Sequence, residues 1–127
     1  MLKWILIAGG GALGAVLRFA LQGMVQPAKG SLFPWGTWIV NVSGCLMIGF
    51  LMALFTGPYA IRPEYRVGII SGILGGYTTF SSVSGEGTQL IEQRQWGLAL
   101  LYIGSSVIVG LLATFAGIRL SQWLFGA

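Results

Sequence analysis

The chain has 127 residues, of which 55% are hydrophobic and only 8% are charged, and its formal net charge is +4. Soluble domains carry about 25% charged residues, so this composition excludes a water-facing surface and predicts an integral protein of the lipid bilayer. Histidine and aspartate are absent and the seven basic residues stand singly. We therefore expect neither an enzyme, with no catalytic residue to assign, nor a nucleic-acid partner.

Four long apolar runs predict a single all-α membrane domain over residues 1–127, with spans at about 2–25, 35–55, 67–92 and 96–125. Four spans of about 20 residues use roughly 80 positions, which leaves only short connections. Proline and glycine punctuate the first two connections. The polar segment Ile61–Arg66 is expected to be a loop before the third span.

The third run has an unusual composition for a helix that faces lipid. Gly72, Gly75 and Gly76 lie close together, and five hydroxyl residues follow within seven positions around Phe80. They are Thr78, Thr79, Ser81, Ser82 and Ser84. Broken helices are tolerated in membranes only where the backbone is buried in protein or lines a wet cavity. The sequence therefore predicts that the third helix is interrupted.

The distribution of basic residues leaves the orientation in the membrane open. Four spans put both termini on one side, with four bases there and three on the other. The first set is Lys3, Arg62, Arg66 and Arg119, and the second is Arg18, Lys29 and Arg94. The positive-inside rule then gives almost no preference. Either the loop charges of a small protein are noisy, or copies insert both ways and pair as an antiparallel dimer.

Polar side chains inside the spans need an explanation, because burial in lipid is expensive. Asn41 in the second span could bond across a helix pair or offer its amide donors to an anion. In the fourth span Tyr102, Ser106 and Gly110 share one helical face, as a packing stripe or as a line of hydroxyl donors. Both interpretations remain open for each residue.

Three further residues complete the candidate set. The ring edge of Phe80 carries positive quadrupole density and can favour an anion. Glu86 is expected to face a vestibule, and Arg18 either snorkels outward or sets a positive potential at a pore mouth. The lining is rich in donors and uncharged at its middle, whereas a cation pore would use rings of carbonyls or carboxylates. This chemistry predicts a small, partly dehydrated anion as the transported species.

Four motifs in order resemble the Fluc/CrcB family of bacterial fluoride channels over nearly the whole chain. They are the glycine-rich first span that ends in Arg18, Pro34-Trp-Gly-Thr37 with Asn41, Gly75-Gly76-Tyr-Thr-Thr-Phe-Ser81, and Ser84-x-Glu86. Each motif is weak alone, but four at matching spacing are specific.

The resemblance implies passive export of fluoride from the cytoplasm by an antiparallel, dual-topology homodimer in the bacterial inner membrane. It implies an anion pathway of Asn41, Phe80, Ser81, Tyr102 and Ser106. It also implies a structural sodium ion at the dimer centre, held by backbone carbonyls around Gly75 and Thr78.

One position departs from the family pattern. The family usually has a second phenylalanine three residues after the first, and here that residue is Val83. The departure raises the alternative that this chain is one half of a heterodimeric channel, or that Tyr77 supplies the missing ring. A small dual-topology multidrug/proton exchanger is a second alternative, but such exchangers rely on a glutamate in the first span, where this chain has no acid.

Overall fold

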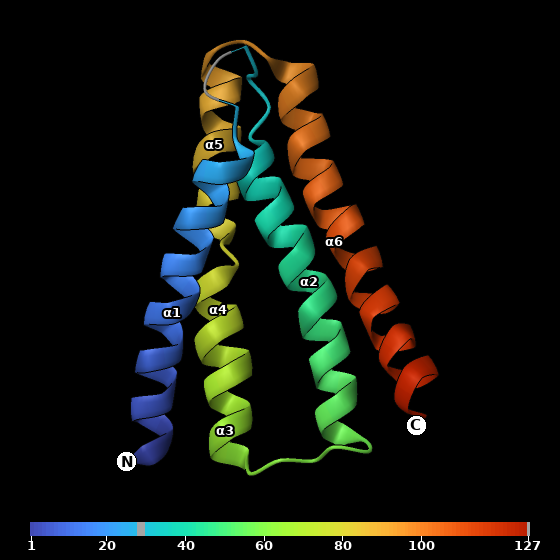
Figure 1. Cartoon of the computed structure of the whole chain (residues 1–127). Coiled ribbons are helices and arrows are strands. Elements are labelled where there is room, and N and C mark those ends of the chain that lie inside the picture. The colour runs from blue at the N-terminus through green and yellow to red at the C-terminus, as the bar shows by residue number, and fades with distance from the viewer. Residues whose placement is uncertain (28–29, 127) are drawn as a thin grey trace.

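The computed structural model describes residues 1–27 and 30–126, and within these residues all regular structure is helical. Lys29, one of the bases counted for orientation, lies outside the described residues. Four helical segments run roughly along one axis (Figure 1). The expectation of an all-α protein with four helices is confirmed, and three of the helices are long and apolar enough to cross a membrane. Those three are α1 (Leu2–Val25), α2 (Trp35–Thr56) and α6 (Trp96–Phe125).

The remaining segment, between residues 63 and 92, is a bent succession of shorter helices. It comprises α3 (Pro63–Val67), the π-helix η1 (Gly68–Leu74), α4 (Gly75–Tyr77) and α5 (Phe80–Glu92). Between α4 and α5 the backbone of Thr78 and Thr79 is extended. This segment begins earlier than expected, because Pro63–Arg66 is helical and not loop. Proline is well suited to the first position of a helix, and Glu64 in the first turn complements the helix dipole.

The helices pack as two close pairs, α1 with η1 and α4, and α2 with α6. In Figure 1 the pairs meet near the turn between α5 and α6 and diverge toward the two chain termini. Backbones touch within each pair: a Cβ on Gly14 would overlap the carbonyl of Ile73, and one on Gly117 would overlap that of Leu46. Small residues at such crossings let the backbones of two helices approach closely in lipid.

One cluster of buried apolar side chains lies where the two pairs meet. It is formed by Phe33, Val83, Leu90, Ala99 and Tyr102, and Val40, Leu74 and Tyr77 are buried outside this cluster. Most large apolar side chains of α1 and α6 are exposed on the single chain, as expected for helices that face lipid or another protein. The packing therefore places Tyr102 and Val83 at the junction where α2, α5 and α6 converge.

Candidate functional site

The extended residues between α4 and α5 are held by the side chain of Asn41 from α2. Its Oδ1 accepts a hydrogen bond from the backbone N–H of Thr79 at 2.8 Å, and its Nδ2 donates to the Thr79 carbonyl at 3.0 Å. The Thr79 hydroxyl in turn accepts from the N–H of Ser82 and caps the start of α5. One N–H of the Asn41 amide is left for another acceptor.

Arg18 of α1 contacts Gly76 in α4, the short helix that precedes the extended residues. Its Nε donates to the carbonyl oxygen of Gly76 at 3.1 Å. That carbonyl lies at the C-terminal end of α4, where the partial negative charge of a helix favours a cation. Arg18, Asn41, Gly76 and Thr79 are called the break cluster below. The hydrogen bonds of Arg18 and Asn41 both go to backbone atoms of the third helical segment, so these two side chains fix backbone geometry.

A cavity of about 390 Å³ lies beside the break cluster, between α2, the third segment and α6. Its lining includes five of the predicted site residues, namely Asn41, Gly75, Thr78, Phe80 and Ser106. The hydroxyl oxygen of Ser106 is buried and has no hydrogen-bond partner among the described residues. Phe80 is 77% exposed on the single chain. The lining thus contains a hydroxyl without a hydrogen-bond partner among the described residues and an exposed ring, and it has no charged side chain.

A second polar group surrounds Glu86 on α5. Its Oε1 accepts from the hydroxyl of Thr37 at 2.8 Å, and its Oε2 accepts from the hydroxyl of Tyr102 at 2.9 Å. Thr37 is 3% exposed and Tyr102 is fully buried. The Nε2 of Gln22 donates to the Thr37 oxygen at 3.0 Å. These four residues, called the carboxylate cluster below, join α1, α2, α5 and α6.

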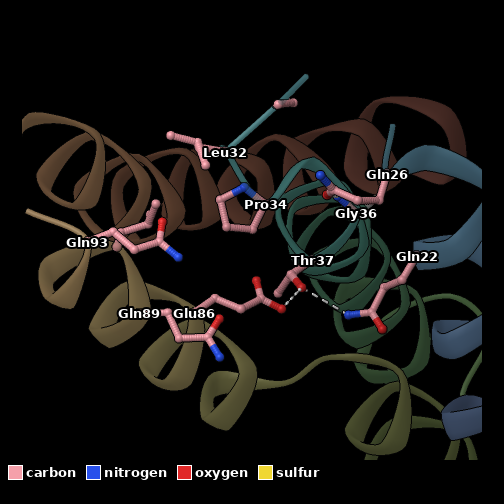
Figure 2. A pocket seen from close by; sticks show the side chains of 11 residues that line it. Gln22, Gln26, Leu32, Pro34, Gly36, Thr37, Glu86, Gln89 and Gln93 are labelled. Carbon is pink, nitrogen blue, oxygen red and sulfur yellow. Dashed lines mark hydrogen bonds between the residues drawn. The ribbon is translucent and has the colours of Figure 1, made fainter. Parts of the chain in front are cut away.

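Three residues of the carboxylate cluster, Gln22, Thr37 and Glu86, line a separate cavity of about 310 Å³ (Figure 2). Glutamines from two helices line its walls, Gln22 and Gln26 from α1 and Gln89 and Gln93 from α5. In Figure 2 the Thr37 hydroxyl lies between the Gln22 amide and the Glu86 carboxylate. The cavity therefore has a hydrophilic wall that includes the Glu86 carboxylate and one of its two hydroxyl donors, Thr37.

Comparison with known proteins places the chain in a family. The family described as "CrcB-like protein, Camphor Resistance (CrcB)" matches residues 5–118. This chain belongs to the CrcB family. A relative from Rhizobium meliloti named "Fluoride-specific ion channel FluC" is 45% identical over 118 residues, which cover 93% of this chain and 94% of the relative. A protein of the same name from Thermus thermophilus is 42% identical over 126 residues, 99% of this chain and 100% of that one. A third, from Nitrosococcus oceani, is 39% identical over 95% of each chain.

The resemblance predicted from the motifs is confirmed, and the CrcB-family chain is a multi-pass membrane protein. Most of the predicted site residues fall into two groups in its structure. The first shares the 390 Å³ cavity, and Glu86 lines the 310 Å³ cavity with Tyr102 as its hydrogen-bond donor. Tyr102 and Ser106, expected to form one stripe, thus serve different environments.

Three residues lie apart from these two cavities. Arg18 reaches the Gly76 carbonyl and is absent from both linings. Ser81 is exposed and shares a hydrogen bond with the Thr79 hydroxyl at 3.1 Å. Tyr77 is buried with its hydroxyl 2.9 Å from that of Ser43, so its ring does not join Phe80 in the 390 Å³ cavity of this CrcB-family chain.

Two further residues of the site, Gln22 and the side chain of Thr37, are not among those predicted from the sequence. Gln22 lies four residues after Arg18, so both face the same side of α1, which is a signal that could have indicated it. Thr37 was noted only as part of a motif. Its link to Glu86 spans 49 positions, and no local pattern in the CrcB-family chain indicates that contact.

Proposed function

We propose that this chain is a fluoride-selective channel that exports cytoplasmic fluoride by passive electrodiffusion. The observation that carries the proposal is the set of relatives named as fluoride-specific ion channels, at 39–45% identity over at least 93% of this chain. An ion channel is not an enzyme, which agrees with the absence of histidine and aspartate. The exchanger alternative is not favoured, because α1 contains no acidic residue.

The proposed anion pathway is made of Asn41, Phe80, Ser81, Tyr102 and Ser106. Asn41 keeps one amide N–H free, and the Ser106 hydroxyl has no partner among the described residues. Fluoride is a strong hydrogen-bond acceptor, so uncharged donors can replace part of its water without holding it by a full charge. Arg18 and Glu86 act at the margins, Arg18 through the backbone of the break and Glu86 at the 310 Å³ cavity.

We infer that the working unit is an antiparallel homodimer in the bacterial inner membrane, with the extended residues Thr78 and Thr79 as an interruption of its third helix. Phe80 is 77% exposed on the single chain, and a second copy would cover it. The nearly balanced basic residues support insertion in both orientations. Adding a cluster of lysines to the loop between α2 and α3 should fix one orientation and abolish flux. Full activity of that form would exclude the antiparallel dimer.

The sodium ion implied by the family is proposed to bind at the carbonyls of Gly75 and Thr78. Hard cations prefer oxygen ligands, and the described hydrogen bonds include none to either of these two carbonyl oxygens. The neighbouring carbonyls of Gly76 and Thr79 are already used by Arg18 and Asn41. The residues present therefore fit a cation, and two carbonyls from each of two copies would surround it with fixed negative dipoles.

Efflux of fluoride from liposomes that contain only this purified chain tests the function. Chloride efflux measured in parallel tests the selectivity. Fast fluoride flux with negligible chloride flux is the expected result, and it would also establish that the chain conducts without a different partner. No flux from well-folded protein would contradict the proposal for the homodimer and favour a heterodimer.

A further inference from the structure

In the carboxylate cluster, the donor and the acceptor of each hydrogen bond can be assigned in only one way. An ionised carboxylate can only accept hydrogen bonds, whereas a hydroxyl has a single hydrogen to donate. The 2.8 Å contact between Thr37 and Glu86 therefore uses the one hydrogen of Thr37. The 3.0 Å contact between Gln22 and Thr37 must then be donated by the Gln22 amide N–H. Gln22 supplies the hydrogen that Thr37 accepts.

The position of Gln22 is fixed by the packing of α1 on the start of α2. A Cβ on Gly36 would lie 2.8 Å from the carbonyl oxygen of Gln22, so the two helices approach closely here. One turn later, Gln26 accepts from the Gly36 N–H at 2.9 Å and donates to the Phe33 carbonyl at 3.2 Å. These contacts hold the residue before Thr37 and leave the Gln22 amide directed at the Thr37 oxygen, as Figure 2 shows.

We propose that Gln22 is a positioning residue for conduction, which keeps the Thr37 hydroxyl hydrogen directed into the carboxylate cluster. The proposal rests on the proposed fluoride channel function. Without a donor at position 22 the Thr37 oxygen loses one of its two hydrogen bonds. The contact between Thr37 and Glu86 in the lining of the 310 Å³ cavity, at the margin of the proposed anion pathway, is then held less firmly. Gln22 acts through Thr37 and need not touch the ion.

The test is a set of substitutions at both positions, each assayed for fluoride efflux from liposomes at equal protein content. Gln22→Met keeps the length of the side chain and removes the donor, and we expect flux to fall by about threefold to tenfold. Gln22→Glu replaces the donor with an acceptor that competes for the Thr37 hydrogen, so its flux should fall further. Gln95→Met and Gln95→Glu are matched controls, because Gln95 is exposed and lies outside the cavity lining.

Combining Gln22→Met with substitutions of Thr37 shows whether Gln22 acts through the Thr37 hydroxyl or only through packing. Thr37→Ser keeps the hydroxyl and Thr37→Val removes it. The proposal requires that Gln22→Met lower flux by the same factor in the wild-type and Thr37→Ser backgrounds, and by less than about 1.5-fold in the Thr37→Val background. A purely structural role would give one factor in all three backgrounds and would overturn the proposal, as would no effect in any of them. Absence of flux from the well-folded wild-type chain would instead contradict the proposed homodimeric channel, and with it this role.

Discussion

The break cluster and the carboxylate cluster use their polar side chains in different ways. In the break cluster, Asn41 and Arg18 bond to backbone atoms of Thr79 and Gly76. In the carboxylate cluster, Thr37 and Tyr102 bond to a side chain, the carboxylate of Glu86. A backbone group can move away from its hydrogen-bond partner only if the helix changes shape. A side chain can do so by changing its rotamer.

The difference indicates separate roles for two sets of polar groups in one apolar chain. The break cluster fixes the shape of the third helical segment, and one N–H of the Asn41 amide remains without a partner there among the described residues. The carboxylate cluster keeps two hydroxyl donors around a group that carries the same charge as an anion. The first cluster is therefore expected to tolerate substitution less than the second.

The largest effect is expected from Asn41→Asp, which tests the break cluster. The new carboxylate loses the donor to the Thr79 carbonyl and repels an anion in the 390 Å³ cavity. We expect fluoride flux in liposomes to fall by about 100-fold, equivalent to about 2.7 kcal/mol on the conduction barrier. Gln122→Glu, the same chemical change outside that cavity, should leave flux near the wild-type value. Unchanged flux in Asn41→Asp would remove Asn41 from the pathway.

Glu86→Gln tests the carboxylate cluster and should have the next largest effect. The neutral amide has one acceptor oxygen, so either Thr37 or Tyr102 then faces an N–H and not a lone pair. We expect flux to fall by about tenfold, and the free energy of unfolding to fall by about 1–3 kcal/mol because a buried hydroxyl loses its partner. Thermal unfolding in detergent measures the second quantity.

The exposed Glu92 provides the control for this substitution, because Glu92→Gln removes the same charge from the same helix. Equal losses of flux in Glu86→Gln and Glu92→Gln would mean that long-range charge, and not the hydroxyl contacts, determines the effect. The carboxylate of Glu86 would then have no local role in conduction.

Local signals in the sequence account for the helical layout. The predicted spans at 2–25 and 96–125 have the same bounds as α1 and α6. They rest on apolar runs long enough to span a bilayer and on the turn residues between those runs. The start at Pro63 differs from the prediction, because the polar residues around it favour a loop although proline is also common at the first position of a helix. The π-helix at Gly68–Leu74 was not expected, since its glycines indicate close packing on α1 but not a wider turn.

Contacts between distant residues limited the prediction of the site. Asn41 was left open between a structural and an anion-binding interpretation, and its two bonds to Thr79 join residues 38 positions apart. The bond from Arg18 to Gly76 joins residues 58 apart. Such pairings depend on how α1, α2 and the third segment pack together, which a single sequence does not specify.

Phe80→Ile tests whether a ring beside the break cluster contributes more than its volume. Phe80 is 77% exposed on the single chain, so its loss should not disturb that chain's own packing. We expect fluoride flux to fall by about fivefold, because the positive edge of the ring is lost. Phe115→Ile is a matched control, since Phe115 is 61% exposed on α6 and outside the 390 Å³ cavity. Flux equal to wild type in Phe80→Ile would make Phe80 a packing residue only.

Val83→Phe should have the smallest effect and tests how the two clusters are connected. Val83 is 4% exposed and lies in the core with Tyr102 of the carboxylate cluster, yet it also lines the cavity that contains Phe80. A larger side chain in the core costs about 1–3 kcal/mol of stability, unless the ring turns into the cavity. A ring that does so adds a second positive edge beside the anion path.

We therefore expect Val83→Phe to raise fluoride flux by no more than about threefold, with a modest loss of thermal stability. Val83→Leu adds volume without a ring and separates the two causes. If Val83→Leu raises flux equally, the gain comes from a shift of Tyr102 and the carboxylate cluster, because leucine has no aromatic edge. If only Val83→Phe raises it, the ring acts at the break-cluster cavity, and valine limits conduction in this chain without preventing it.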